Sequence, residues 1–255
     1  MAATKSLGSL HSKIADGIAT LTFGHPASNS FPVNLLKELT TAIQALGNND
    51  DIRAVVIQSE GEGAFCAGAS FDELLAVCTA SEGTAFFSGF AHLINTIRVC
   101  PKVIIGRIQG KAIGGGVGIA AACDYVLATK QASVKLSELA IGIGPFVIEP
   151  AVSRKIGKTA MTQMTLAAQE WKSAEWAQEH GLYAAVFETI SELDAAVNQM
   201  ASQLGSYNPQ ALLEIKKVFW EGTDHWETLL VERAAISGQL VLSDFTKKAL
   251  LQFKK

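Results

Sequence analysis

Two glycine-containing segments each follow an apolar run of the kind that forms a buried strand. Residues 64–71 follow the run 55–57, and residues 110–118, which include three consecutive glycines, follow the run 103–105. Where such a turn leads into a helix, the first N–H groups have no partner inside the helix, and the helix dipole favours negative charge. Two such turns side by side can direct N–H groups at one oxygen atom, which is the architecture of an oxyanion hole.

Other roles for these turns are weaker. An isolated glycine-rich turn often only allows a helix and a strand to pack closely. A G-x-G-x-x-G motif starting at Gly114 requires glycine at position 119, where the chain has Ile119. A P-loop requires Ser or Thr after its lysine, but Lys111 is followed by Ala112. The spacing therefore excludes these two nucleotide-binding motifs.

Four short blocks occur in a fixed order along the chain. They are Phe-Cys-Ala-Gly-Ala at 65–69, Gly-x-Ala-x-Gly-Gly-Gly at 110–116, Cys-Asp at 123–124 and Ser-Glu-x-x-x-Gly-x-x-Pro at 137–145. In order and separation they resemble the enoyl-CoA hydratase/isomerase (crotonase) superfamily, over nearly the whole chain. The resemblance implies an α/β fold with a ββα spiral core and a helical C-terminal region. It also implies an enzyme acting on CoA thioesters, with CoA as part of the substrate, no tightly bound cofactor and no metal.

The resemblance also implies roles for residues in both turns. Ala69 and Gly115 match the positions whose backbone N–H groups polarise the thioester carbonyl. Ala67 matches a position whose carbonyl contacts the adenine of CoA, and Phe65 and Gly68 are expected in the same CoA-binding turn.

Only one of the two catalytic glutamates of the hydratases has a counterpart. Glu138 matches one of them, whereas Gly118 occupies the position of the other. Outside this motif, a glutamate in a turn is more often simply exposed. Phe146 replaces a glycine of the family and is expected to narrow or dry the pocket. Glu149, one helical turn further on, is a candidate replacement for the missing carboxylate; alternatively it complements the dipole at a helix start.

A single carboxylate beside an oxyanion hole suits acid–base chemistry on an enolate. In a dry pocket it suits a 1,3-proton shift that relocates a double bond, and desolvation by Phe146 is expected to raise the pKa of Glu138. Two carboxylates flanking a water suit hydration of a 2-enoyl-CoA. The residues favour isomerisation slightly, with hydration close behind. A non-catalytic acyl-CoA-binding or scaffold protein is the remaining alternative, because of the loss at Gly118.

The elements that must position these residues alternate between strand and helix. Such alternation favours crossover units over a sandwich. Residues 1–190 are expected to form the α/β core, and residues 191–255 a helical C-terminal region that the resemblance implies is used for trimerisation. The predicted elements are a hairpin around Asp16-Gly17, strands at 54–57, 103–105 and 125–127, and helices after Pro32, over 81–98, from Gly114 and from Asn208-Pro209.

Composition limits the partners and the compartment. The net charge of −3 gives no electrostatic footprint for nucleic acid or an anionic membrane. The four cysteines lack a C-x-x-C pair, the five histidines lack metal-ligand spacing, and no targeting signal is visible, so a cytoplasmic protein with reduced thiols is expected. Cys66 is expected to be a packed thiol.

Assembly is expected from composition and resemblance together. The hydrophobic fraction of 49% suggests surface buried between subunits, and the resemblance implies a homotrimer or a hexamer of two stacked trimers, with the tail reaching a neighbour. Lys247, Lys248 and Lys254 are then candidates to meet the CoA phosphates, with a solvated helix face as the alternative.

Overall fold

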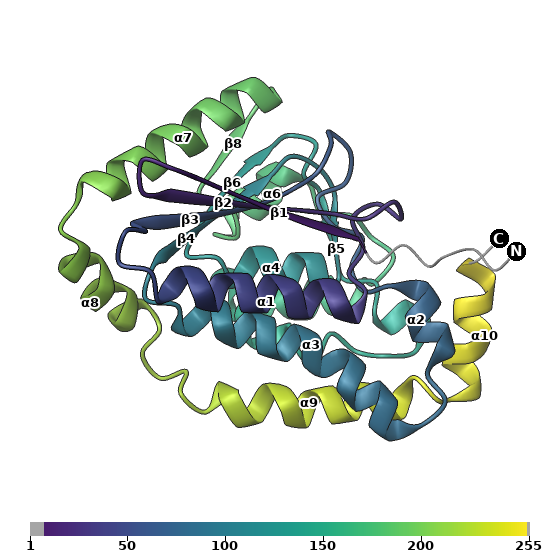
Figure 1. Cartoon of the computed structure of the whole chain (residues 1–255). Helices are drawn as coiled ribbons and strands as arrows, with labels where there is room; N and C mark the ends of the chain where they lie inside the picture. The colour runs from purple at the N-terminus through teal and green to yellow at the C-terminus, as the bar shows by residue number, and fades with distance from the viewer. Residues whose placement is uncertain (1–7, 254–255) are drawn as a thin grey trace, which may run out of the picture.

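A six-stranded sheet lies at the centre of the computed structural model, which describes residues 8–253 (Figure 1). Its strand order is β1-β2-β3-β4-β6-β8; the first pair is antiparallel and each later pair is parallel. The strands are β1 (Ser9–Ala15), β2 (Ile18–Gly24), β3 (Ala54–Ser59), β4 (Val103–Ile108), β6 (Tyr125–Thr129) and β8 (Ala185–Phe187). The expected hairpin is confirmed, because Asp16 and Gly17 both have the positive φ, 50° and 76°, that its two-residue turn requires.

Helices cover both faces of this sheet (Figure 1). Alternate residues of β3 separate the two sides: Val55 and Ile57 belong to the larger hydrophobic cluster, and Ala54 and Val56 to the smaller one. Strands buried on both faces read as continuous apolar runs, as these do. The larger cluster includes α1 (Val33–Gly47), α3 (Ala80–Val99) and α4 (Gly115–Ala122), and the smaller includes α7 (Ile190–Ser206).

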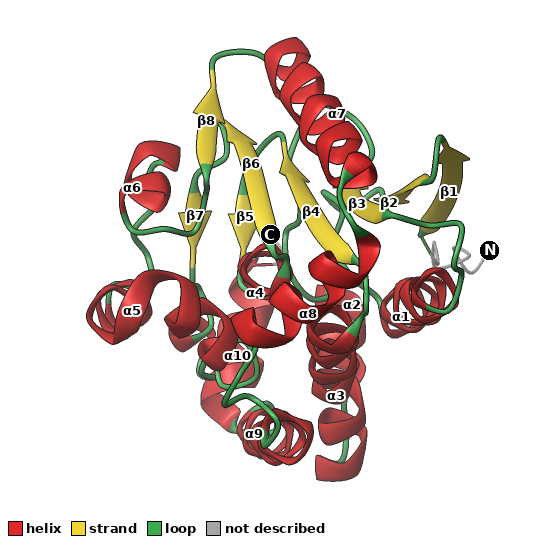
Figure 2. Cartoon of the chain, turned by 90° about the vertical axis from the view of Figure 1, so that its left-hand side faces the viewer, coloured by secondary structure: helices red, strands yellow, loops and turns green. Residues whose placement is uncertain are grey.

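A second, two-stranded parallel sheet lies outside the main sheet (Figure 2). It consists of β5 (Ala112–Ile113) and β7 (Val134–Lys135). An isolated bridge from Cys66 to Ala112 and another from Phe31 to Ala69 extend the pairing. The expected α/β core with a spiral path is therefore confirmed. Between β3 and β8 the chain also forms α2 (Phe71–Ala76), the 3-10 turn η1 (Leu139–Ile141), α5 (Glu149–Leu166) and α6 (Ala174–Glu179).

Three further helices form the C-terminal tail, α8 (Pro209–Phe219), α9 (Trp226–Leu240) and α10 (Asp244–Phe253). The tail folds back on its own chain: α9 runs along α3 (Figure 1), where Gly83 and Gly238 meet so closely that a Cβ on Gly83 would lie 2.7 Å from the Cα of Gly238. The helical C-terminal region is confirmed. However, α7, which begins at the expected boundary near 190, packs across the sheet and belongs with the core. The short strand β8 was not expected from the sequence.

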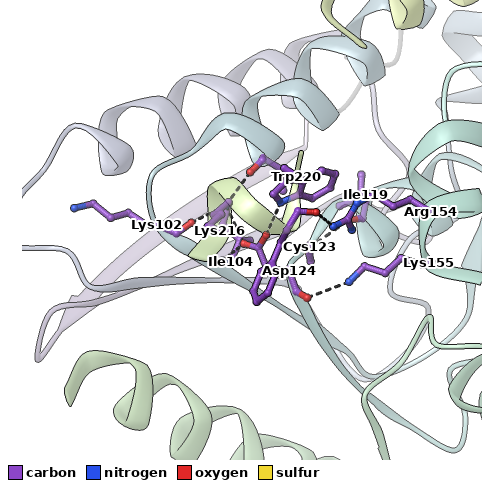
Figure 3. A network of polar contacts seen from close by, with 11 residues as sticks. Lys102, Ile104, Ile119, Cys123, Asp124, Arg154, Lys155, Lys216 and Trp220 are labelled. Carbon is purple, nitrogen blue, oxygen red and sulfur yellow. Dashed lines mark hydrogen bonds and ion pairs between the residues drawn. The ribbon is translucent and has the colours of Figure 1, made fainter. Parts of the chain in front are cut away.

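A buried polar network joins the tail to the core (Figure 3). The carboxylate of Asp124 lies 2.8 Å from Nζ of Lys216 and accepts hydrogen bonds from Nε1 of Trp220 and the backbone N–H of Ile104, each at 2.8 Å. The Asp124 and Lys216 side chains are each only 4% exposed. Since both charges are paired and further hydrogen-bonded, the cost of their desolvation is offset, and α8 is held against β4 and β6.

Within residues 8–253, no helix is long and apolar enough to cross a membrane. All four cysteines are free thiols.

Candidate active site

The two glycine-containing turns and Glu138 open onto one cavity. Its volume is about 70 Å³, and it is partly open to solvent. Apart from Glu138 and two serines, the side chains that line it are apolar. The lining residues that the sequence had singled out are Ala67, Gly68, Ala69, Gly114, Gly115, Glu138, Pro145 and Phe146.

Backbone hydrogen bonds tie the two turns together. The N–H groups of Phe65 and Cys66 donate to the carbonyl of Lys111 at 3.0 and 3.2 Å, and the N–H of Ile113 donates back to the carbonyl of Cys66 at 2.9 Å. The N–H of Gly114 donates to the carbonyl of Lys135 at 2.9 Å, which connects the second turn to β7 and so to the segment carrying Glu138. The mutual position of the turns is therefore set mainly by main-chain atoms.

Within the described chain, this network leaves the N–H groups of Ala69 and Gly115 without a partner. Among the described residues, neither the N–H of Ala69 nor that of Gly115 has a hydrogen-bond acceptor, whereas the flanking N–H groups of Ser70 and Gly114 donate to Phe31 and Lys135. Gly115 is the first residue of α4, where N–H groups have no intrahelical partner. Both residues line the cavity. Free N–H groups facing a largely apolar cavity are the donors that an oxyanion site needs.

Glu138 supplies the only ionisable side chain among the lining residues. Its Oε2 is buried and has no hydrogen-bond partner in the described chain. Desolvation of the carboxyl group raises the pKa of Glu138 to about 7, against a smaller lowering effect from its own backbone N–H. A carboxyl group with this pKa can both accept and release a proton near neutrality.

Gly114 allows Glu138 to reach the turns. Its φ of 51° is unfavourable for residues with a side chain. A Cβ at this position would also lie only 2.8 Å from Oε1 of Glu138. The first glycine of the triple is thus needed both for the turn and for the close approach of the carboxylate.

Ile148 fills the space beside Gly118, where hydratases carry their other glutamate. A Cβ on Gly118 would overlap Cγ2 of Ile148 and lie 2.7 Å from its Cβ. Ile148 and Phe146 both line the cavity, and neither can hold a water by hydrogen bonding. This side of the cavity is apolar where a hydratase has a carboxylate.

The structure does not bring Glu149 into the cavity. Its side chain accepts hydrogen bonds from Ser153 and Lys158 and forms an ion pair with Arg233 on α9. Partial burial alone would raise the pKa of Glu149, but the hydrogen bonds from Lys158, Ser153 and Arg233 and the charge of Arg233 hold it at about 2. Glu149 is the first residue of α5, so the helix-start alternative describes its position better than that of a second catalytic carboxylate.

Phe65, which was expected in the CoA-binding turn, is not among the residues that line the cavity. Its side chain is fully buried and packs edge-on against Phe23, with ring centroids 5.3 Å apart. Cys66 is equally buried; burial raises the pKa of its thiol to about 12 and makes it a packing group, as expected.

Several lining residues were not recognised from the sequence. Phe87 and Phe90 come from α3, and Ser237 comes from α9 of the tail. Helical periodicity alone cannot tell which buried side chains face a cavity, so nothing in the sequence distinguished them. The suggested phosphate-binding residues Lys247 and Lys248 are exposed on α10, and Lys254 lies outside the described residues.

Comparison with known proteins agrees with this geometry. The family model described as enoyl-CoA hydratase/isomerase matches residues 13–253. A mitochondrial methylglutaconyl-CoA hydratase of Homo sapiens is 32% identical over 233 residues, covering 89% of this chain and 68% of that protein. A peroxisomal Delta(3,5)-Delta(2,4)-dienoyl-CoA isomerase of Arabidopsis thaliana is 26% identical over 234 residues, covering 86% of this chain and 82% of that protein.

The fold is shared with solved structures as well. The crystal structure of an enoyl-CoA hydratase from Bacillus halodurans superposes with a TM-score of 0.86 at 23% identity, covering 95% of this chain and 99% of that chain. With a matching family model over nearly the whole chain and relatives of this similarity, the chain belongs to the enoyl-CoA hydratase/isomerase family of enzymes.

Proposed function

We propose that this enzyme shifts the double bond of an enoyl-CoA thioester, from the 3-enoyl to the 2-enoyl form, with Glu138 as its only acid–base group. One observation carries the proposal. The unpartnered, buried Oε2 of Glu138 belongs to the same cavity as the free N–H groups of Ala69 and Gly115.

The proton path follows from these three groups. The thioester oxygen accepts hydrogen bonds from the N–H groups of Ala69 and Gly115, which acidifies the protons on C2. The Glu138 carboxylate removes a C2 proton, and the electron pair of that C–H bond is delocalised over the dienolate and the thioester oxygen. Neutral Glu138 then returns the proton to C4, and the double bond lies between C2 and C3.

Isomerisation needs no water and no second carboxylate, which suits the apolar side of the cavity. Ile148 occupies the space beside Gly118, and Phe146 lies on the same stretch of wall. Desolvation also keeps part of the Glu138 population protonated near pH 7. One group can therefore serve as base and then as acid.

The remaining parts of the substrate are assigned by resemblance. We place the pantetheine arm along Ala67 and Gly68, with the carbonyl of Ala67 on the adenine and Lys247 and Lys248 near the phosphates. CoA enters only as part of the substrate, without a tightly bound cofactor or a metal. A cytoplasmic homotrimer or hexamer is the form in which we expect the enzyme to act.

Hydration of a 2-enoyl-CoA is the second candidate. Ser137 and Ser237 are the other polar side chains of the cavity, and either hydroxyl can hold a water that Glu138 activates. Relatives named as hydratases favour this reading too. A scaffold role without turnover is disfavoured. A buried carboxyl oxygen without a hydrogen-bond partner lowers the stability of the fold, and catalysis explains this cost whereas a scaffold role does not.

The test is a panel of 2-enoyl- and 3-enoyl-CoA thioesters with the purified protein, following double-bond position and water uptake. We expect 3-enoyl substrates to yield 2-enoyl products. Glu214→Gln removes an exposed ion pair on α8 and serves as the control for activity losses caused by mutagenesis and purification. Water uptake by 2-enoyl-CoA with no isomerisation would replace the proposal by its second candidate, and thioester binding without any turnover would support the scaffold reading.

A further inference from the structure

The stretch from Glu138 to Ile148 forms much of the cavity wall and lies against the C-terminal tail. It contributes Ile141, Ile143 and Phe146 to the lining in addition to its two ends. Apart from the single turn of η1 it contains neither strand nor helix. Its position therefore depends on what packs against it.

The tail contacts this stretch at two places. On α10, Phe245 and Thr246 lie so close to Gly142 that a Cβ there would come within 2.5 Å of both side chains. On α9, Arg233 donates a hydrogen bond to the carbonyl of Phe146 at 3.4 Å and forms an ion pair with Glu149. One helical turn after Arg233, Ser237 is 1% exposed and lines the cavity. The same helix thus forms part of the cavity wall and holds the adjoining stretch.

Glu149 is the centre of the second contact. Its Oε1 accepts from Ser153 on the same helical segment and from Lys158, which lies just beyond a kink at Gly157, and its Oε2 binds Arg233. We call these four residues the Glu149 clamp. Side chains of Glu149 and Arg233 are 21% and 26% exposed, so the pair is partly shielded from solvent. A partly buried pair with several hydrogen bonds is stronger than an exposed one.

We propose that the Glu149 clamp sets the acyl-group selectivity of the cavity by holding Phe146 and Ile148 in the wall. Glu149 is then a positioning residue: it acts through the Phe146 carbonyl and the start of α5 without touching the reacting atoms. The inference rests on the proposed function for its substrate class. In this role the tail shapes the cavity of its own chain, independently of the oligomeric state.

The test compares a short and a long substrate, 3-hexenoyl-CoA and 3-dodecenoyl-CoA, with the full-length protein. Glu149→Gln and Arg233→Met weaken the clamp, Arg233→Lys preserves its charge, and Glu214→Gln removes an exposed ion pair of similar chemistry as a matched control. We expect both weakening variants to raise KM for the short substrate about tenfold, the scale on which apolar pockets discriminate. We expect kcat to stay within about twofold, because Glu138 and the oxyanion turns are unchanged.

Three further results are expected if the clamp acts as a unit. KM for the long substrate should change less than KM for the short one, the double variant should be little worse than either single variant, and Arg233→Lys should recover most of the loss. Equal changes for both substrates would overturn the proposal. So would a fall in kcat of about 1,000-fold in Glu149→Gln, which would make Glu149 catalytic.

A binding measurement separates this inference from the proposed reaction. Calorimetric titration with hexanoyl-CoA and dodecanoyl-CoA requires no turnover. In one outcome the protein turns over no 3-enoyl substrate while the variants still lower the affinity for hexanoyl-CoA more than that for dodecanoyl-CoA. That result would support the role of the clamp and contradict the proposed reaction. Unchanged affinities for both thioesters would overturn the clamp whatever reaction the enzyme catalyses.

Discussion

The two sides of the cavity are built by different means. On one side, the turns at 65–70 and 110–115 are joined by main-chain hydrogen bonds, such as that from Ile113 to Cys66. On the other, the stretch from Glu138 to Glu149 is held by side chains of the tail, above all Arg233. The first side can keep its geometry while side chains elsewhere change. The second can be reshaped by single substitutions, and this is where acyl selectivity can vary without loss of the oxyanion site.

Glu138→Gln is expected to have the largest effect, because it removes the only ionisable group of the cavity. The amide keeps the shape of the side chain but cannot exchange a proton at neutral pH. Turnover of 3-enoyl-CoA should fall at least ~1,000-fold, while thioester affinity should stay within about threefold. Steady-state kinetics and titration with a saturated acyl-CoA check this. Residual turnover above about one-tenth of wild type would contradict the assignment.

Gly114→Ala tests the junction between the two sides and should have the next largest effect. The added Cβ meets both an unfavourable positive φ and Oε1 of Glu138 at 2.8 Å. We expect kcat/KM to fall about 100-fold, since a displacement of about 1 Å at reacting groups has that scale. Gly61→Ala is the matched control: its φ is 75°, but nothing lies within 4 Å of the added methyl group.

The control separates backbone strain from displacement of the carboxylate. Gly61→Ala should lower the free energy of unfolding by about 1 kcal/mol and leave kcat/KM unchanged. Equal losses of activity in both variants would mean that strain alone, and not the approach to Glu138, limits position 114.

The pH dependence should be smaller, about tenfold in rate. The base form of Glu138 takes the C2 proton, and its pKa is about 7. Subsaturating kcat/KM should therefore rise about tenfold between pH 6 and pH 8. A flat profile would indicate that Glu138 is already ionised throughout this range or is not the base.

The same raised pKa should appear in stability. Below about pH 4.5 the carboxyl group is neutral in both states, and above this value the unfolded chain ionises first. The free energy of unfolding should fall as pH rises towards 7, by at most about 3 kcal/mol. In Glu138→Gln this decrease should be absent. Urea unfolding of both proteins at pH 5 and pH 8 measures the difference.

The backbone-held side was the more predictable one. The two glycine-containing turns are visible directly in the sequence, and Ala69 and Gly115 within them could be singled out because they match the positions that the family resemblance assigns to the oxyanion hole. The tail-held side was predicted less well. Glu149 is one helical turn from Phe146, but its direction is decided by Arg233, far away in the sequence, and no local pattern shows that pairing. Ser237 was missed for the same reason. The strand β8 is only three residues long and too short for a periodicity signal.

Gly118→Glu should have the smallest effect on chemistry and tests whether the two sides can be combined as in a hydratase. By sequence alone, restoring this glutamate is expected to raise hydration if water has room. In the structure there is no space for the glutamate and a water, because a side chain at position 118 would clash with Ile148. The single variant should gain less than about twofold in hydration rate and lose about 1–3 kcal/mol of stability from overpacking.

Gly118→Glu combined with Ile148→Ala removes the clash, and this double variant should hydrate 2-enoyl-CoA faster than either single variant. Ile148→Ala alone is the control for a merely wider cavity. If Gly118→Glu alone gave efficient hydration, Ile148 would have to move aside easily, and the contrast between a rigid and an adjustable side of the cavity would need to be redrawn.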